Sequence, residues 1–370
     1  MRTSRTLGLV AAITLLFGCV AGNKSKPPPA EITTATSGED EPTYAIVKTY
    51  FATDRSLTGD ARPSAMFGAG RSDVRYGFCD VSIPRDHRMG ELESPSVWKL
   101  EFREDPEKHV VLLSAVTTPA DTFFASVADR VRHSQRKSAF LFVHGYNVSF
   151  EDAARRTAQI SYDLGFDGAP VFYSWPSEGA TAAYTVDEQS IEWAQANLRT
   201  FLADFLTRSD AQDVYLIAHS MGNRALTRAV ASLMAEKPNL RPRLKEIILA
   251  APDIDADVFK RDIAPGLVAT GRPVTLYASS NDKALIASKA VHGYRRAGDA
   301  GGGLVILRGI ETVDASIVDT SFVGHSYIAE DPTVLKDLHL LIRDGKAADQ
   351  RATLRGIDGT AGRHWEFRKP

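Results

Sequence analysis

The 370-residue sequence contains only two cysteines, Cys19 and Cys79, and two cysteines cannot form a disulfide framework. We expect Cys79 to be a small buried residue. An excess of charge of either sign is also lacking, because 44 Lys and Arg stand against 46 Asp and Glu. Because the positive and negative charges nearly balance, the chain has no long-range attraction to phosphate backbones, which argues against nucleic acid as a partner. The apolar run Leu7–Phe17 spans about eleven residues, too few for a permanent transmembrane helix.

The sequence also lacks the motifs of metal and cofactor chemistry. Its nine histidines are scattered, and none has the spacing to a cysteine or carboxylate that metal ligands show. The glycine-rich stretch 298–303 lacks the lysine and the strand–loop–helix setting of a phosphate-binding loop, so we interpret it as a flexible loop. The sequence therefore predicts neither a metal nor a cofactor. What is present, 44% hydrophobic and 24% charged residues, is typical of a globular protein.

The N-terminus has the features of an export signal. Two arginines precede the apolar run, which ends in Leu16-Phe17-Gly18-Cys19 and resembles a bacterial lipobox. This pattern predicts a lipoprotein-type signal peptide over residues 1–18 and lipidation of Cys19. The alternatives are an ordinary signal peptide cleaved near Ala21 and an uncleaved anchor. By analogy with such lipoproteins, Val20 after the cysteine favours the outer membrane, with the protein facing the periplasm.

Composition divides the remainder of the chain into three parts. Residues 19–44 are rich in Pro, Ser and Thr and are expected to form a disordered tether. Residues 45–345 form the predicted folded domain, with N-terminal strands and one helix in 45–136 and the catalytic core in 137–345. Residues 346–370 are polar and are expected to be a loosely held C-terminal tail.

Short apolar segments alternate with amphipathic ones along this domain. Strands are expected at 45–51, 77–83, 97–102, 109–116, 138–144, 171–175, 214–218, 247–250, 274–278 and 304–307. Helices are expected at 121–133, 149–165, from 185 onward, at 222–235, at 283–287 and at 334–340, with capping boxes at Ser149–Asp152 and Thr185–Glu188. This alternation predicts a mostly parallel sheet with helices on both faces. Ligands of such sheets gather at the carboxyl ends of the strands.

One strand-to-helix junction carries the sequence Ala218-His219-Ser220-Met221-Gly222. It matches the Gly-x-Ser-x-Gly nucleophile elbow, with alanine at the first glycine position. The turn around such a serine is sharp, so the residues two before and two after it must be small. The pattern therefore predicts that Ser220 is a nucleophile. The alternative is a serine that only caps the following helix.

The segment Phe142–Asn147 follows an earlier predicted strand. In a sheet that carries a nucleophile elbow, the loop at this place supplies one backbone N–H to the oxyanion, and the residue after the nucleophile supplies the other. The predicted donors are the N–H groups of Tyr146 and Met221. His144, in the same segment, is interpreted as a structural residue that braces the loop.

An acid and a base must follow the serine in that order. Asp282 follows the strand 274–278 and is the predicted acid; Asp253 is the alternative, although an aspartate there is also expected to cap a helix. His325, in Gly324-His325-Ser326-Tyr327, follows the last predicted strand and is the predicted base. His292, in a loop rich in Gly and Arg, is its alternative.

Several segments together resemble a known family. The chain from 45 to 345 is similar to bacterial α/β-hydrolases of the esterase/lipase superfamily whose function is unassigned. The resembling segments are Tyr50–Arg55, Tyr76–Pro84, Phe142–Asn147, Tyr173–Ser177, Ala218–Asn223, Leu249–Asp255, Leu276–Asp282 and Gly324–Tyr327. The resemblance implies the α/β-hydrolase fold and a serine triad at Ser220, Asp282 and His325, but no substrate.

These expectations combine into a lipid-anchored serine hydrolase that cleaves carboxylic esters, either small-molecule or lipid esters. An esterase is favoured over a lipase or peptidase only because esterases are common on this scaffold. An acyltransferase would use the same triad. A non-enzymatic envelope module on a hydrolase scaffold is the alternative from a different class.

Overall fold

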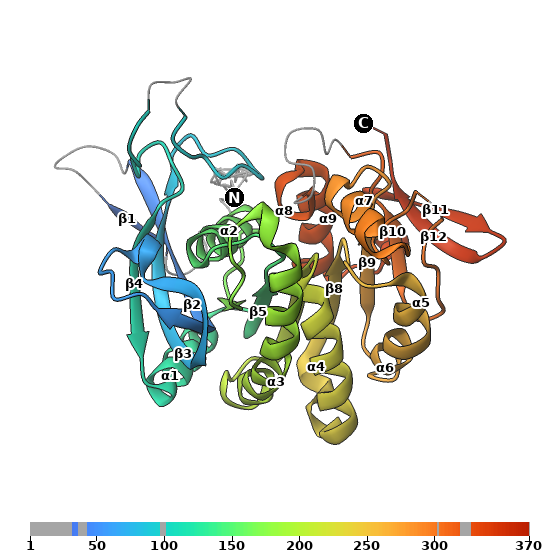
Figure 1. Ribbon diagram of the computed structural model, residues 1–370, viewed down its shortest axis with the longest axis horizontal. Helices are drawn as coiled ribbons and strands as arrows, with labels where there is room; N and C mark the ends of the chain where they lie inside the picture. Colours follow the sequence, from blue (N-terminus) through green and yellow to red (C-terminus); the bar gives the residue numbers. More distant parts are fainter. Residues whose placement is uncertain (1–31, 36–42, 97–100, 302, 319–326, 370) are drawn as a thin grey trace, which may run out of the picture.

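The computed structural model describes residues 32–35, 43–96, 101–301, 303–318 and 327–369. Within these residues twelve strands form one sheet, in the order β11-β12-β10-β9-β8-β7-β5-β6-β2-β3-β4, with β1 beside β2 (Figure 1). The strands are β1 (Ile32–Ala35), β2 (Tyr44–Leu57), β3 (Phe67–Pro84), β4 (Leu112–Thr118), β5 (Ser138–Val143), β6 (Ala169–Ser174), β7 (Asp213–His219), β8 (Leu244–Ala250), β9 (Val274–Ala278), β10 (Glu311–Asp314), β11 (Leu354–Gly359) and β12 (Gly362–Phe367).

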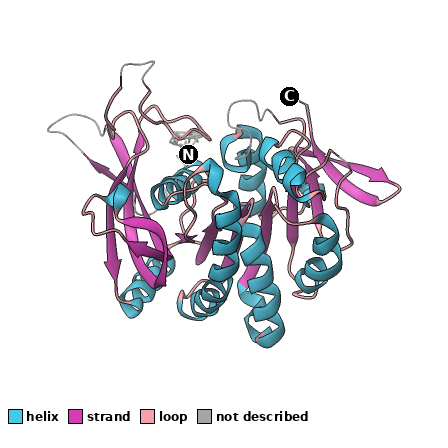
Figure 2. Ribbon diagram, in the orientation of Figure 1, coloured by secondary structure: helices cyan, strands magenta, loops and turns pink. Residues whose placement is uncertain are grey.

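Helices connect most of the central strands (Figure 2). They are α1 (Ala120–His133), α2 (Phe150–Asp163), α3 (Tyr184–Arg208), α4 (Gly222–Glu236), α5 (Ala256–Val258), α6 (Ala264–Val268), α7 (Lys283–His292), α8 (Tyr327–Glu330) and α9 (Pro332–Ile342). Each neighbouring pair from β2 through β6, β5, β7, β8, β9 and β10 to β12 is parallel. The antiparallel pairs lie toward the two ends of the sheet. The mostly parallel sheet predicted from the sequence is confirmed.

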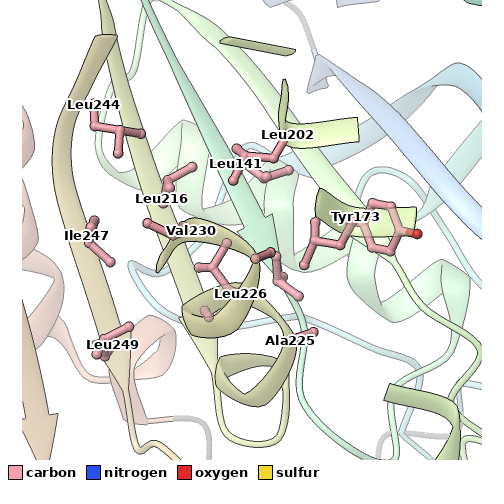
Figure 3. Packing of buried hydrophobic residues seen from close by; sticks show 14 of the residues in the cluster. Leu141, Tyr173, Leu202, Leu216, Ala225, Leu226, Val230, Leu244, Ile247 and Leu249 are labelled. Atoms are coloured by element: carbon pink, nitrogen blue, oxygen red, sulfur yellow. The ribbon is translucent and has the colours of Figure 1, made fainter. Parts of the chain in front are cut away.

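Alternating side chains of the buried strands pack into two hydrophobic cores. Leu141 of β5 and Leu216 of β7 point to the face covered by α1, α3 and α4, whereas Phe142 points to the face covered by α2 and α9. Figure 3 shows the first core, where Leu226 and Val230 of α4 lie against the strands. Since both faces are covered, the strands are apolar throughout, as the sequence pattern indicated.

The C-terminal segment 346–370 is not loosely held, and the prediction of a tail is wrong. Its strands β11 and β12 form an antiparallel hairpin, and β12 pairs in parallel with β10. Phe367 is buried and stacks on Tyr277. Arg351, also buried, binds Asp337 of α9. The segment is polar because a hairpin at the end of the sheet needs few apolar anchors, so its composition does not reveal that it is paired.

Two predicted strands differ from the structure. Residues 304–307 form no strand: Val305 is buried as part of a loop, and the strand that follows is Glu311–Asp314, whose two acidic ends hide its short buried centre. Of the predicted strand 97–102, residues 97–100 lie outside the described residues. Phe102 belongs to no strand and is 75% exposed.

The two predicted capping boxes have different outcomes. Ser149 caps α2 reciprocally with Asp152, as predicted. The box at Thr185 is wrong, because α3 already begins at Tyr184 and Glu188 binds Arg224 and His292 instead. Glu188 is therefore not part of a cap, since its partners lie on other helices.

The predictions for the N-terminus are only partly open to comparison. The proposed signal peptide 1–18 and Cys19 lie outside the described residues. Within the expected tether 19–44, residues 32–35 form β1 against β2, so the tether prediction is wrong there. No helix of the described part of the chain has the length and apolarity to cross a membrane.

Candidate functional site

Ser220 lies on a strained turn between β7 and α4. Its φ of 51° is in the left-handed region, which costs energy for a residue with a side chain. The turn needs glycine at position 222, because a Cβ there would lie 2.3 Å from the carbonyl oxygen of His144. Asn223 fixes the turn by donating to the carbonyl oxygens of Ser220 (2.9 Å) and Ala250 (3.0 Å). The local geometry is that of a nucleophile elbow.

The loop after β5 lies directly against this serine. A Cβ at Gly145 would lie 2.9 Å from the Ser220 Cβ, so only glycine permits the close approach. The backbone N–H of Tyr146 follows in this loop, and the N–H of Met221 precedes the first turn of α4. Among the described residues neither N–H has a hydrogen-bond acceptor. Two free donors beside a buried serine are what an oxyanion hole requires.

His144 braces this loop, as the sequence interpretation held. It stacks on Trp175, whose indole N–H donates to the His144 carbonyl oxygen at 2.8 Å. Its Nδ1 lies 2.7 Å from the Gly145 carbonyl oxygen, and its Nε2 lies 3.3 Å from Ser174 Oγ. Burial lowers the pKa of His144 well below its ordinary value, and the charge of Arg55 adds to this. The imidazole is therefore neutral, with both nitrogens engaged.

The two candidate acids have different surroundings. Asp282 follows β9, is fully buried, and caps α7 by accepting the Leu285 N–H at its Oδ1. Asp253 follows β8. Its carboxylate contacts Arg224, Arg296, Tyr184 and Ser288.

These contacts keep Asp253 charged. Burial alone would raise its pKa, but Arg224, Ser288 and Tyr184 together hold the pKa below its ordinary value. The expectation that Asp253 caps the following helix is wrong, since Asp255 caps α5. Both oxygens of the Asp253 carboxylate are therefore already bound.

The segment 295–299 joins the two loops that carry these acids. Gly298 donates its N–H to the Pro252 carbonyl oxygen at 3.0 Å and accepts the Ser279 N–H at 2.9 Å. A Cβ at position 298 would lie 2.5 Å from the carbonyl carbon of Ala251. The stretch 298–303 thus begins with a glycine required for close packing, which corrects its interpretation as simply a flexible loop.

Of the two candidate bases, His292 lies within the described residues and His325 does not. His325 lies outside the described residues, between the end of β10 and the start of α8. The last residue of β10, Asp314, pairs with Ala278 of β9. His292 ends α7, and its Nε2 lies 2.8 Å from Glu188 Oε1.

A cavity of about 210 Å³ lies beside the elbow. Leu92, Phe142, Val148 and Ala329 form its apolar part; His144, Gly145, Asn147, Asp152, Arg156 and His219 complete its lining. Gly145 and His219 are the residues of this lining that adjoin Ser220. The cavity has room for a small organic group near Ser220, although Ser220 does not itself line it.

Sequence reasoning missed two residues that hold the loops around the site. Arg55, at the end of the first long strand, is 2% exposed and binds the loops after β5 and β6. Asp187, in the first turn of α3, is fully buried and binds the same two loops. The only available signal was the charged pair Asp54-Arg55 directly after an apolar strand, where a buried charge needs a specific partner.

A mostly parallel sheet covered by helices on both faces, with a serine elbow after β7 and a loop after β5 packed against that serine, is typical of the α/β-hydrolase class. Residues 120–344 match the family model described as "Alpha/beta hydrolase of unknown function (DUF900)". The match covers more than half of the chain, and the protein belongs to this family.

Comparison with other proteins assigns no activity to this chain. No curated protein matches the chain. Solved structures with a similar fold include a predicted CIB-like hydrolase from Thermoplasma acidophilum, with 12% identity, a TM-score of 0.35, and coverage of 81% of this chain and 99% of that chain. An esterase from Rhizomucor miehei has 12% identity, a TM-score of 0.33 and 85% coverage of both chains. A hyperthermophilic esterase from Pyrobaculum calidifontis has 12% identity, a TM-score of 0.30, and coverage of 61% and 92%.

Proposed function

We propose that this protein is a serine hydrolase that cleaves carboxylic esters of small molecules or lipids. Ser220 is the nucleophile, His325 the base and Asp282 the acid that orients it. The observation that carries the proposal is the strained, buried Ser220 beside the N–H groups of Tyr146 and Met221, which have no acceptor among the described residues. A serine that only caps a helix needs neither the strain nor the donors.

The proposed reaction proceeds through an acyl-enzyme. His325 takes the proton of the Ser220 hydroxyl as its oxygen bonds to the ester carbonyl carbon, and the two N–H groups stabilise the resulting oxyanion. The C–O bond to the alcohol breaks, and His325 returns the proton to the leaving alcohol. Water then repeats the sequence on the acyl-enzyme and releases the acid. In an acyltransferase an alcohol would replace this water.

The surroundings of the two aspartates support Asp282 over Asp253 as the acid. Asp253 already binds two arginines and two hydroxyls, so orienting a histidine would require one of these contacts to break. Asp282 follows the next strand of the sheet and accepts the Leu285 N–H at the start of α7. Both positions after neighbouring strands lie at the carboxyl edge of the sheet, where triad acids occur.

Labelling with a fluorophosphonate probe tests the proposal. We expect the purified, folded chain to react and the heat-denatured chain not to react. Mass spectrometry of the tryptic peptide spanning 209–224 should then show the adduct on Ser220 and not on Ser209. The same protein should hydrolyse p-nitrophenyl esters of graded acyl length. A folded chain that stays unlabelled and hydrolyses none of these esters would favour the non-enzymatic module.

We also propose that Cys19 is lipidated and anchors the protein at the outer membrane, facing the periplasm. The basic residues, apolar run and cysteine at its end support this. Cells fed labelled palmitate should incorporate it into the wild type but not into Cys19→Ser, and only the wild type should fractionate with outer membranes. Equal incorporation in both would refute the lipid anchor.

A further inference from the structure

The loop that would supply the Tyr146 N–H is held by two buried charged residues from distant parts of the chain. The Arg55 guanidinium donates to the carbonyl oxygens of Val148 (2.7 Å) and Ser177 (2.8 Å) and to Ser174 Oγ (2.8 Å). Burial lowers the pKa of Arg55 to about 10, so it remains cationic at neutral pH. One side chain thereby ties the loop after β5 to the loop after β6.

Asp187 binds the same two loops. Its Oδ2 accepts the Asn147 N–H at 3.2 Å and the Ser177 hydroxyl at 2.6 Å, and its Oδ1 accepts the Glu178 N–H at 2.8 Å. Ser177 Oγ in turn accepts the Val148 N–H at 3.2 Å. The backbone N–H groups of Asn147 and Val148 are therefore both fixed by this arrangement.

These contacts engage the neighbours of the Tyr146 N–H but not the Tyr146 N–H itself. Asn147 has a φ of 57°, a left-handed conformation that turns the chain sharply after Tyr146. His144 and Gly145 use their carbonyl oxygens to bind Trp175 and the His144 ring. Within the part of the chain that the structure describes, the Tyr146 N–H is thus an unpaired donor between positions whose polar groups are bound.

We propose that Arg55 and Asp187, joined through Ser177, are positioning residues that set the Tyr146 N–H for the oxyanion. This inference rests on the proposed hydrolase function. Neither residue touches the substrate. They hold the donor in place before the reaction, and a displacement of about 1 Å in such a group can lower the rate about 100-fold.

The test replaces Ser177 by alanine, which removes the hydroxyl between Asp187 and the Val148 N–H. The matched control is Ser82→Ala, because Ser82 is also fully buried and its Oγ also accepts a backbone N–H, that of Val111, at 3.0 Å. Both variants lose one buried hydroxyl, so we expect similar losses of stability. Only Ser177→Ala should lower kcat for a p-nitrophenyl ester, by about 10- to 100-fold, with KM within about two-fold of the wild type.

Reaction with diethyl p-nitrophenyl phosphate gives a second readout, because its phosphoryl oxygen would use the same donors. Its second-order rate should fall in parallel with kcat in Ser177→Ala and not in Ser82→Ala. Asp187→Asn should behave like Ser177→Ala, since an amide has one acceptor oxygen where Asp187 uses two. The Asp187→Asn variant replaces Ser177→Ala in both measurements if Ser177→Ala does not fold.

Two results would overturn the proposal, and they are distinguishable. If the wild type is active and both loop variants keep the kcat of the control, the positioning role is wrong while the hydrolase function stands. If the folded wild type neither reacts with the phosphate ester nor hydrolyses any ester, the hydrolase function fails and the positioning role fails with it.

Discussion

Ser220→Ala is expected to lower kcat for a p-nitrophenyl ester on the order of 10⁵- to 10⁶-fold. The variant loses the atom that attacks the ester carbonyl carbon, and His325 loses the proton that it would transfer. The free N–H groups of Tyr146 and Met221 should remain in place, so a residual rate above that of water is expected. Steady-state hydrolysis of the best ester from the graded panel measures this effect.

Ser134→Ala is the control for this variant. Ser134 is buried at the end of α1, and its hydroxyl donates to the Val131 carbonyl oxygen at 2.8 Å. Its loss should leave kcat within about two-fold of the wild type and should cost about 1 kcal/mol of stability. If Ser220→Ala keeps the wild-type rate while still folded, the hydrolysis comes from another residue or a contaminating enzyme.

The elbow could be predicted from the sequence because its chemistry is local. Five consecutive residues, a preceding apolar strand and a following amphipathic helix define both the serine and the need for Gly222. The structure adds the strain at Ser220 and the close approach of Gly145. These features follow from local backbone sterics, which the sequence pattern records.

The sequence favours Asp282 over Asp253 by its position along the chain, but it does not show how the surroundings of the two aspartates differ. Both aspartates follow buried strands, and the difference lies in partners from other elements. Arg224 comes from α4, Tyr184 from the start of α3 and Arg296 from the loop beyond α7. Arg55 and Asp187 were missed for the same reason. Arg55 binds Val148, 93 positions away, and Asp187 binds Asn147, 40 positions away. Sequence spacing carries no record of such contacts.

The same limit explains the errors in the fold. The interpretation of 304–307 as a strand followed its apolar residues, which lie partly or fully buried in a loop, while β10 has acidic ends. The C-terminal hairpin appeared polar and loose because its attachment depends on Arg351, Leu354 and Phe367. A buried ion pair looks like two surface charges until both partners are seen.

Arg351→Ala is expected to lower the free energy of unfolding by about 3–5 kcal/mol, because it leaves a buried carboxylate without its cation. The Arg351 and Asp337 side chains are both fully buried and their charged atoms lie 2.8 Å apart. Arg351 also donates to the Tyr277 hydroxyl at 3.0 Å and to Glu311 at 3.2 Å. Denaturant unfolding of the purified variant measures the loss.

Arg355→Ala is the matched control from the same segment. Its guanidinium pairs with Glu366 on the exposed surface of the hairpin, at 2.7 Å with the arginine 54% exposed, so its loss should cost no more than about 1 kcal/mol. Equal, small losses for both arginines would mean that the segment 346–370 is loosely held after all. A large loss confined to Arg351→Ala would show that the hairpin is part of the cooperative fold.

Two further measurements distinguish the effect of an unpaired Asp337 carboxylate from a simple loss of packing. Burial already raises the pKa of Asp337 in the wild type, and the charge of Arg351 opposes this rise. In Arg351→Ala the pKa of Asp337 in the folded state should therefore rise further above that of the unfolded chain. A carboxyl group with a raised pKa favours the folded state at low pH, and this contribution is lost as the pH rises through the raised pKa. The loss in free energy of unfolding of Arg351→Ala relative to the wild type should therefore be smaller at pH 4 than at pH 7. The double variant Arg351→Met with Asp337→Leu should recover most of the loss, because it removes both charges and keeps the volume filled.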